Sequence, residues 1–197
     1  MFLDLSKYQI ILASGSPRRQ ALLREIGLDF TTIVKPVDES YPSDLKGQQI
    51  TDYIAKKKAE AHNNDLSQNT ILITSDTLVM YHDCIMGKPS TLQEAKHLIQ
   101  TLSGNTHQVV TSVCFTCGNG RQILKSATTK VTFSSLTLKE INFYLETFKP
   151  MDKAGAYGIQ EWIGLIGVEH IEGSYFNVVG LPTHLVYQTL KEIVTDE

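Results

Sequence analysis

The stretch "YQIILASGSPRRQALLREIG", residues 8–27, decides the fold class, because it joins a buried strand to an amphipathic helix through one short turn. Residues 8–14 are a short apolar run with β-branched side chains, a pattern that predicts a buried strand. Ser16 is placed to cap a helix that begins at Pro17, since the first helical position favours proline. Apolar residues follow at helical spacing, and Gly27 ends the helix. A strand that leads directly into a helix is typical of α/β proteins.

The rest of the chain continues the alternation and then changes to a hairpin. Thr-x-x-Glu capping boxes open two of the predicted helices, and Gly118-Asn119-Gly120 is a hairpin turn signal. Strands and helices that alternate early, with a hairpin in the middle, predict an α/β fold with a mixed sheet and flanking helices. The predicted strands cover 29–34, 71–80, 107–117 and 121–133, and the predicted helices cover 51–62, 91–102, 137–148 and the segment after Pro182.

Composition and charge narrow the function class. The chain has 197 residues, 42% hydrophobic and 20% charged, enough for one domain with a sizeable core. The net charge of −3 argues against a nucleic-acid-binding surface, so an anion must be held by locally placed cations. No apolar run has the length of a membrane span, and the N-terminus does not read as a signal peptide, so we expect a cytoplasmic protein without a membrane partner. The single C-x-x-C, Cys114 and Cys117, is expected to be two free thiols on opposite faces of a strand.

Arg18 and Arg19 lie in the first helical turn, where the helix dipole disfavours positive charge by about 0.3–1 kcal/mol each. A bound anion reverses that sign. Backbone N–H groups, the hydroxyls of Ser14 and Ser16, and the two guanidinium groups would then be phosphate ligands. The alternative, two solvated arginines on an exposed turn, stays open from this stretch alone.

Two acidic positions are candidates for catalysis and metal binding. Asp76 interrupts an otherwise apolar strand, where an ionised carboxylate is costly unless it is paired or bound to a metal. The alternative is that Asp76 ends the strand and caps the next turn. Glu39, next to Asp38 in a loop, becomes a candidate metal ligand if it meets Asp76 around a divalent cation, since magnesium binds one or two carboxylates plus substrate phosphates.

Two lysines and one glutamine complete the candidate set. Lys58 falls on the inner stripe of its helix, whereas Lys56 and Lys57 point elsewhere; a lysine that snorkels at the stripe edge is an equal alternative. Lys88 lies in a turn after the Asp76 strand, and its alternative is a plain surface lysine. Gln160 ends the glycine-containing segment "DKAGAYGIQ" and offers both a donor and an acceptor to a base edge.

Eight spaced motifs together carry a resemblance to a known family. In order they are "LASGSPRRQALL", "VDE", "KKA", "SDTLV", "GKP", "LSGNTHQVVTSV", "DKAGAYGIQ" and "GSYFNVVGLP", and they span nearly the whole chain. Together they resemble the Maf family of septum-formation-inhibitor-like nucleotide pyrophosphatases. Within it, "SPRR" and "DKAGAYGIQ" look like the branch that acts on dTTP and UTP.

The resemblance implies one Maf-like domain over residues 1–197. The fold would be mixed α/β with two lobes around a cleft, related to inosine triphosphate pyrophosphatases. The implied reaction is metal-dependent hydrolysis of a nucleoside triphosphate, with Mg²⁺ or Mn²⁺, to the monophosphate and pyrophosphate. A homodimer is also implied. By motif, Asp76 would be catalytic, Glu39 and Asp76 would bind metal, Ser14, Ser16, Arg18, Arg19, Lys58, Lys88 and Gln160 would bind substrate, and Arg18, Thr77 and Gln160 would select the base.

Departures from the family pattern are few, and none falls on a proposed catalytic group. Ser75 replaces alanine or glycine, Asn105 stands where lysine or glutamine is frequent, and Ser112 replaces glycine in "TSV". Two other functions stay open: a non-catalytic nucleotide-binding regulator of cell division, and a pyrophosphatase that prefers another base. The sequence also leaves open whether Asp76 is a base or mainly a metal ligand.

Overall fold

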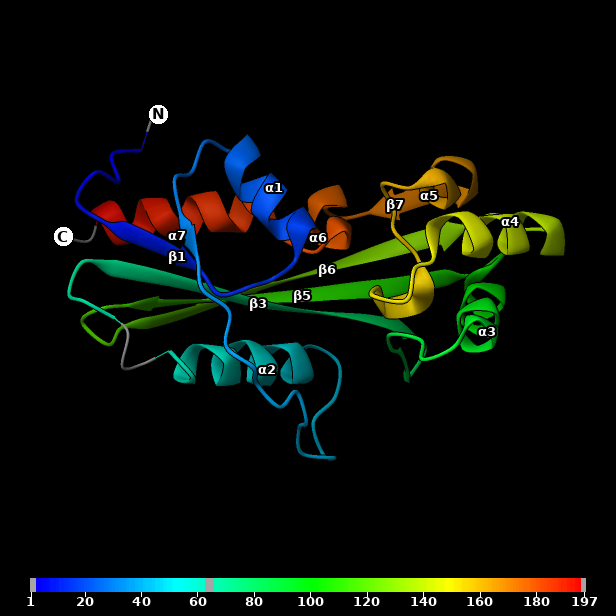
Figure 1. Ribbon diagram of the computed structural model, residues 1–197, viewed down its shortest axis with the longest axis horizontal. Helices are drawn as coiled ribbons and strands as arrows, with labels where there is room; N and C mark the ends of the chain where they lie inside the picture. The colour runs from blue at the N-terminus through cyan, green and yellow to red at the C-terminus, as the bar shows by residue number, and fades with distance from the viewer. Residues whose placement is uncertain (1–2, 63–65, 196–197) are drawn as a thin grey trace. The chain divides into compact units, whose positions relative to one another are not determined.

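The computed structural model describes residues 3–62 and 66–195 and contains a seven-stranded mixed sheet in the order β2-β1-β3-β5-β6-β7, with β4 paired to β3 (Figure 1). Strand β1 runs parallel to β2 and to β3, whereas β3–β4 and β6–β7 are antiparallel. The predicted mixed sheet with flanking helices is therefore confirmed. The strands are β1 (Gln9–Leu12), β2 (Thr31–Thr32), β3 (Thr70–Tyr81), β4 (Cys84–Met86), β5 (Thr106–Cys117), β6 (Gln122–Phe133) and β7 (Val168–Glu172).

The chain divides into two compact units. Unit 1 consists of the described residues among 1–76, 111–127 and 180–197, and unit 2 consists of residues 77–110 and 128–179. Strands β3, β5 and β6 each contribute residues to both units. The predicted single domain and the predicted cleft stay predictions.

Unit 1 is a layered α/β structure. Helix α2 (Gln48–Glu60) covers one face of its strands, and α1 (Pro17–Glu25) and α7 (Thr183–Thr195) lie on the other (Figure 1). Against α2, Ala55 and Ala59 pack on Ile11, Leu72 and Cys114. Each fully buried Leu or Ile side chain contributes about 1.5–3 kcal/mol. The two alanines let the helix approach closely and so fix where its C-terminal half meets the strands.

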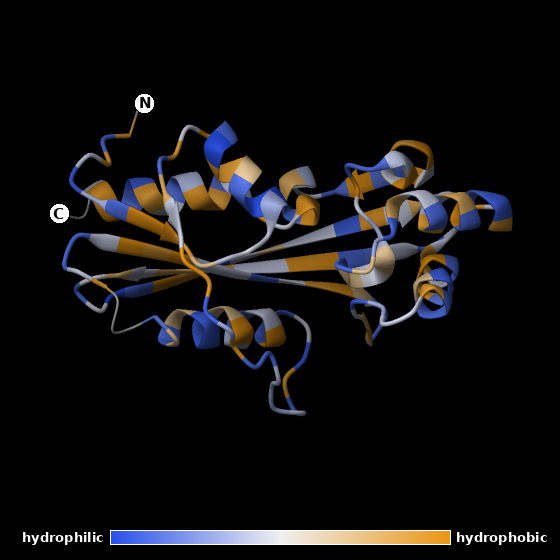
Figure 2. Ribbon diagram, viewed as in Figure 1, coloured by the Kyte–Doolittle hydropathy of each residue, from blue (hydrophilic) through white to orange (hydrophobic). Residues whose placement is uncertain are grey.

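Unit 2 combines strand segments with several short helices. Helix α3 (Leu92–Leu102) packs against α4 (Leu138–Phe148) and against the one-turn helix η2 (Ala154–Ala156). Figure 2 shows hydrophobic and hydrophilic residues alternating along α3 and α4, as expected of helices with one buried face. Helices α5 (Trp162–Gly167) and α6 (Tyr175–Val179) flank β7 in the sequence.

Most predicted elements are present, with shifted ends. The predicted strand over 29–34 is reduced to the two residues of β2, and the helix predicted from residue 51 begins at Gln48. The capping box of α4 is complete, but that of α3 is not: Thr91 accepts from the Glu94 N–H, while the Glu94 carboxylate accepts from Ser90 instead. Among the described residues, no helix has the length and hydropathy needed to cross a membrane.

Candidate functional site

The strand-to-helix turn of unit 1 is organised by two serine hydroxyls. Ser16 is the N-cap of α1, and its hydroxyl accepts from the backbone N–H of Arg19 at 3.4 Å. Ser14 is buried, and its Oγ accepts from the Ser16 N–H at 3.3 Å. Pro17 occupies the start of the helix, as predicted. The turn is thus a fixed helix N-terminus, the feature that favours an anion.

Arg19 links three segments of unit 1. Its Nε donates to the Gly180 carbonyl at 2.8 Å, and Nη1 donates to the Ser75 carbonyl at 2.9 Å and to Ser14 Oγ at 3.3 Å. Burial lowers the pKa of Arg19, and the nearby Asp76 carboxylate opposes that effect. A guanidinium stays protonated in proteins, so a permanent positive charge is fixed beside this turn. Arg18, one residue earlier, is half-buried.

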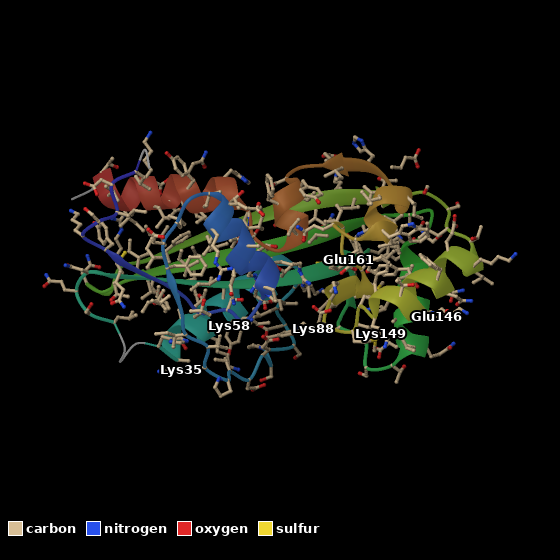
Figure 3. The ribbon with its side chains drawn as sticks, turned by 45° about the horizontal axis from the view of Figure 1, so that its top comes forward. Lys35, Lys58, Lys88, Glu146, Lys149 and Glu161 are labelled. Atoms are coloured by element: carbon tan, nitrogen blue, oxygen red, sulfur yellow. The ribbon has the colours of Figure 1, made fainter. Side chains whose placement is uncertain are left out.

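Lys58 brings three predicted site residues together. Its Nζ lies 2.8 Å from Glu39 Oε1 and 2.8 Å from Asp76 Oδ1. The side chains of Lys58 and Asp76 are 17% and 12% exposed, whereas that of Glu39 is 47% exposed. Lys58 projects from α2 (Figure 3), and the sequence predicts that it lies on the inner stripe of this helix. Its ammonium therefore bridges two carboxylates rather than snorkelling to solvent.

Asp76 lies within a strand and not at its end. Strand β3 continues to Tyr81, so the alternative in which Asp76 caps a turn is wrong. The neighbouring β1 does stop earlier, because Leu12 pairs with Ile73 as the last pair between the two strands. Asp76 therefore lies just past the carboxyl end of a parallel neighbour, a place where open α/β sheets bind ligands.

The loop that carries Glu39 is held in place through Asp38 and Ser40, the residues on either side of Glu39. Asp38 accepts from the backbone N–H of Ser40 at 3.0 Å and from its hydroxyl, and these hydrogen bonds lower the pKa of Asp38. Lys57 donates to the Ser40 carbonyl at 3.0 Å and to Asp38 at 3.4 Å. Lys57, which the sequence places off the inner stripe of its helix, therefore contacts the same loop as Lys58.

Three predicted site residues belong to unit 2. Thr77 directly follows Asp76 and is half-buried, while Lys88 and Gln160 are exposed. The Gly155 N–H donates to the Gly87 carbonyl at 3.1 Å, so the segments that carry Lys88 and Gln160 are joined. That these three residues act together with those of unit 1 stays a prediction.

A divalent cation fits this donor set only in company with a phosphate. Within residues 3–62 and 66–195, no group of three or more His, Cys, Asp or Glu side chains is placed to hold a metal. Glu39 and Asp76 nevertheless direct two carboxylate oxygens at one point, where Lys58 now holds both. Magnesium is commonly bound by one or two carboxylates plus substrate phosphates, which matches this pair.

Sequence reasoning missed the groups that support the candidate residues. The carbonyls of Ser75 and Gly180 hold Arg19, and no side-chain pattern marks a carbonyl. Gly180 has a φ of 121°, a backbone conformation that residues other than glycine rarely adopt. The glycine of "VVGLP" was therefore the sequence feature that could have marked this position. Lys57 was missed because helical periodicity considers only the face towards the sheet.

Comparison with known proteins gives full-length relatives. The family described as "Maf-like protein" matches residues 9–193. A dTTP/UTP pyrophosphatase of Christiangramia forsetii is 54% identical over 190 residues, covering 96% of each chain. A second, from Flavobacterium johnsoniae, is 48% identical over 96% of this chain and 97% of its own. Among solved structures, the Ham1 protein of Staphylococcus aureus aligns with a TM-score of 0.47 at 14% identity, over 64% of this chain and 71% of that one.

Proposed function

Because this chain belongs to the Maf family, we propose that it is an enzyme that hydrolyses dTTP and UTP to the monophosphate and pyrophosphate. The observation that carries the proposal is the contact of Lys58 with both Glu39 and Asp76, beside the first turn of α1, which includes Arg19. A protein that only binds nucleotide has no need of a buried carboxylate next to a phosphate site. The names of the two full-length relatives support the same substrates.

Charge neutralisation is the main demand of the reaction. Water attacks the α-phosphorus while pyrophosphate leaves, so negative charge grows on the leaving group. Arg18, Lys58 and Lys88 are proposed to bind the triphosphate. Arg19 holds the N-terminus of α1 in place and adds its charge there, and the hydroxyls of Ser14 and Ser16 complete that turn.

Asp76 is proposed to act on the attacking water. Its carboxylate is buried and fixed by Lys58, so it can orient the water or accept its proton. A divalent cation held by Glu39 and Asp76 would supply further charge neutralisation at the phosphates. No covalent intermediate is required.

Base selection is assigned to Arg18, Thr77 and Gln160. Gln160 is exposed and carries an amide that pairs with a pyrimidine edge. Thr77 follows the proposed catalytic residue directly, so it couples the choice of base to the position of the reacting phosphate.

A substrate panel tests the proposal. The protein is incubated with dTTP, UTP, CTP, ATP and GTP in the presence of Mg²⁺ or Mn²⁺, and both pyrophosphate and orthophosphate are quantified. We expect pyrophosphate release, fastest with dTTP and UTP. Orthophosphate as the sole product, or nucleotide binding without turnover, would contradict the proposal, the second result favouring a regulator.

Substitution of Asp76 tests its role. We expect Asp76→Asn to lower kcat by a factor of roughly 10²–10⁴, the usual contribution of an acid–base group, while UTP still binds. The matched control is Asp83→Asn, an exposed aspartate in the turn between β3 and β4. Full activity in Asp76→Asn would remove this carboxylate from the mechanism.

A further inference from the structure

Glu161 joins the two ends of the segment that precedes it. The Lys153 ammonium lies 3.1 Å from Glu161 Oε1 and 2.8 Å from Asp152 Oδ1. The Tyr144 hydroxyl donates to Glu161 Oε2 and accepts from the Gly158 N–H at 3.0 Å. One carboxylate, labelled in Figure 3, therefore holds residue 153 directly and residue 158 through a tyrosine.

These contacts lie in a largely buried environment. The Lys153 side chain is 10% exposed and that of Glu161 is 25% exposed, while Tyr144 is fully buried in α4. Burial, together with the hydrogen bond to Glu161, raises the pKa of Tyr144, so its hydroxyl stays a donor. Charge-assisted hydrogen bonds in such surroundings are shorter and stronger than neutral ones, and they hold a fixed geometry.

The carboxylate of Glu161 lies against the backbone of Gly158. A Cβ added at Gly158 would lie 2.8 Å from the Glu161 Cδ, which shows that the carboxylate packs directly on this glycine. The adjacent Tyr157 is held by its hydroxyl, 2.7 Å from His107 Nε2. Gln160 itself is exposed, and the anchored residues lie on either side of it, at positions 157, 158 and 161.

Base discrimination by an amide requires such fixing. Uracil and thymine offer an N3–H donor beside the O4 acceptor, whereas cytosine offers an N3 acceptor beside an amino donor. A glutamine amide carries one donor end and one acceptor end, so an amide turned by half a rotation reads the other base. The amide can turn about its own last side-chain bond, so a held backbone contributes position: it fixes the place from which the Gln160 side chain approaches the atoms of the base edge.

We propose that Glu161 is a positioning residue that fixes Gln160 and thereby sets the preference for uracil and thymine over cytosine. The proposal rests on the proposed function, because it assigns Gln160 to the base. Lys153 and Tyr144 act with Glu161, since the ammonium group of one and the hydroxyl of the other contact its two carboxylate oxygens. None of the three is required to touch the substrate.

The test compares UTP with CTP. Glu161→Gln removes the charge that Lys153 neutralises, and we expect the ratio of kcat/KM for UTP to that for CTP to fall roughly tenfold or more, because small misplacements have large kinetic costs. Glu146→Gln, the same change at an exposed position of α4, is the matched control and should leave the ratio unchanged. A structural role alone would lower Tm and both kcat/KM values together, with the ratio intact, and would overturn the proposal.

Two further variants disturb the Glu161 carboxylate without replacing Glu161 itself. Gly158→Ala displaces the carboxylate by contact, and Tyr144→Phe removes its bond to the Gly158 loop; both should lower the ratio as Glu161→Gln does. Lys153→Arg keeps the cation and should retain the ratio. If Glu161→Gln does not fold, these variants decide, and an unchanged ratio in Gly158→Ala and Tyr144→Phe rejects the proposal.

Binding measurements separate this proposal from the proposed function. The same variants are made on the Asp76→Asn background, and Kd values for UTP and CTP are measured by calorimetry without turnover. If the wild-type protein hydrolyses no nucleotide, the proposed function is rejected. The positioning proposal is still supported in that case if the protein binds UTP more tightly than CTP and Glu161→Gln abolishes this preference. An equal preference in both proteins would reject positioning alone.

Discussion

At the scale of the residue, Arg19 explains why a helix begins with an unfavourable charge. Its guanidinium donates to two carbonyls and one hydroxyl that come from three separate segments of unit 1. The fork geometry of a guanidinium can serve several acceptors at once, which an ammonium cannot. The cost at the helix dipole is offset by these bonds even before an anion arrives.

Arg19→Lys should therefore destabilise the fold as well as weaken substrate binding. We expect the free energy of unfolding to fall by about 1–3 kcal/mol, because part of the buried carbonyl set loses its donor. Chemical denaturation measures the change. Arg24→Lys, at an exposed position of the same helix, is the control and should change stability by less than about 0.5 kcal/mol. Equal stability of the two variants would contradict a linking role for Arg19.

At the scale of the element, α2 is anchored by a cluster of hydroxyls around one carboxylate. Asp52 Oδ1 accepts from Ser112 Oγ at 2.6 Å and from Ser126 Oγ at 2.6 Å, and Thr51 Oγ1 lies 2.6 Å from Ser112 Oγ. The serines come from β5 and β6, so the cluster ties the helix to two strands. Ser112 is also the position at which the family pattern has glycine. A glycine at this position could not make the side-chain hydrogen bonds by which Ser112 joins β5 to the helix that carries Lys58.

Ser112→Ala should loosen this anchor. The side chains of Thr51 and Asp52 would each lose a partner in a buried setting, so we expect a loss of about 1–3 kcal/mol in the free energy of unfolding. Since α2 carries Lys58, kcat/KM for UTP should also fall. Ser43→Ala, at an exposed loop position, provides the baseline for both measurements. A variant as stable and as active as that baseline would argue that the cluster has no anchoring effect.

Elements with a clear period could be predicted from the sequence, and the short ones could not. The strand before Ser16 and the helix capped by Thr137 were both recognised from local patterns. Helices α5 and α6 have six and five residues, too few to show a helical period. Their positions depend on tertiary contacts; for example, a Cβ added at Gly167, the last residue of α5, would lie 3.2 Å from Leu136 Cδ2.

At the scale of the whole molecule, stability should depend on pH through His107. This histidine is 1% exposed, and burial lowers its pKa to about 4, whereas an unfolded histidine has a pKa of about 6.5. Between these values the unfolded chain binds a proton that the folded chain does not. The stability is therefore complete above about pH 6.5 and decreases as the pH falls to about 4, by roughly 3 kcal/mol at most from this group.

Unfolding experiments over this range isolate the contribution of His107. The free energy of unfolding of the wild type should fall more steeply between pH 6.5 and 4 than that of His107→Gln, because carboxylates titrate alike in both proteins. His97→Gln, an exposed histidine of α3, should keep the wild-type slope. Parallel curves for all three proteins would mean that His107 is protonated equally in the folded and unfolded states.

The candidate site was predictable in its charged side chains and not in its supports. Lys58 and Asp76 each broke a local apolar pattern, which is why they could be recognised before their contact was known. Arg19 violated the dipole preference in the same way. The groups that hold these side chains fit the local sequence patterns and therefore could not be identified from the sequence. The Ser75 carbonyl, for example, belongs to an ordinary strand residue, and only the folded structure shows that it accepts from Arg19. Exceptions to a pattern can be read from a sequence, but their partners depend on the folded chain.

Lys57 and Lys58, consecutive residues of α2, make the length of this helix part of the site. Ala55 and Ala59 fix its rotation against the strands, while Lys57 and Lys58 contact the loop of Glu39. One residue inserted between Ile54 and Lys57 would turn everything after it by about 100° around the helix axis. Both ammonium groups would then leave their carboxylates, although no side chain had been replaced. Natural variation in this part of the chain should therefore consist of substitutions, with insertions and deletions confined to the loops on either side.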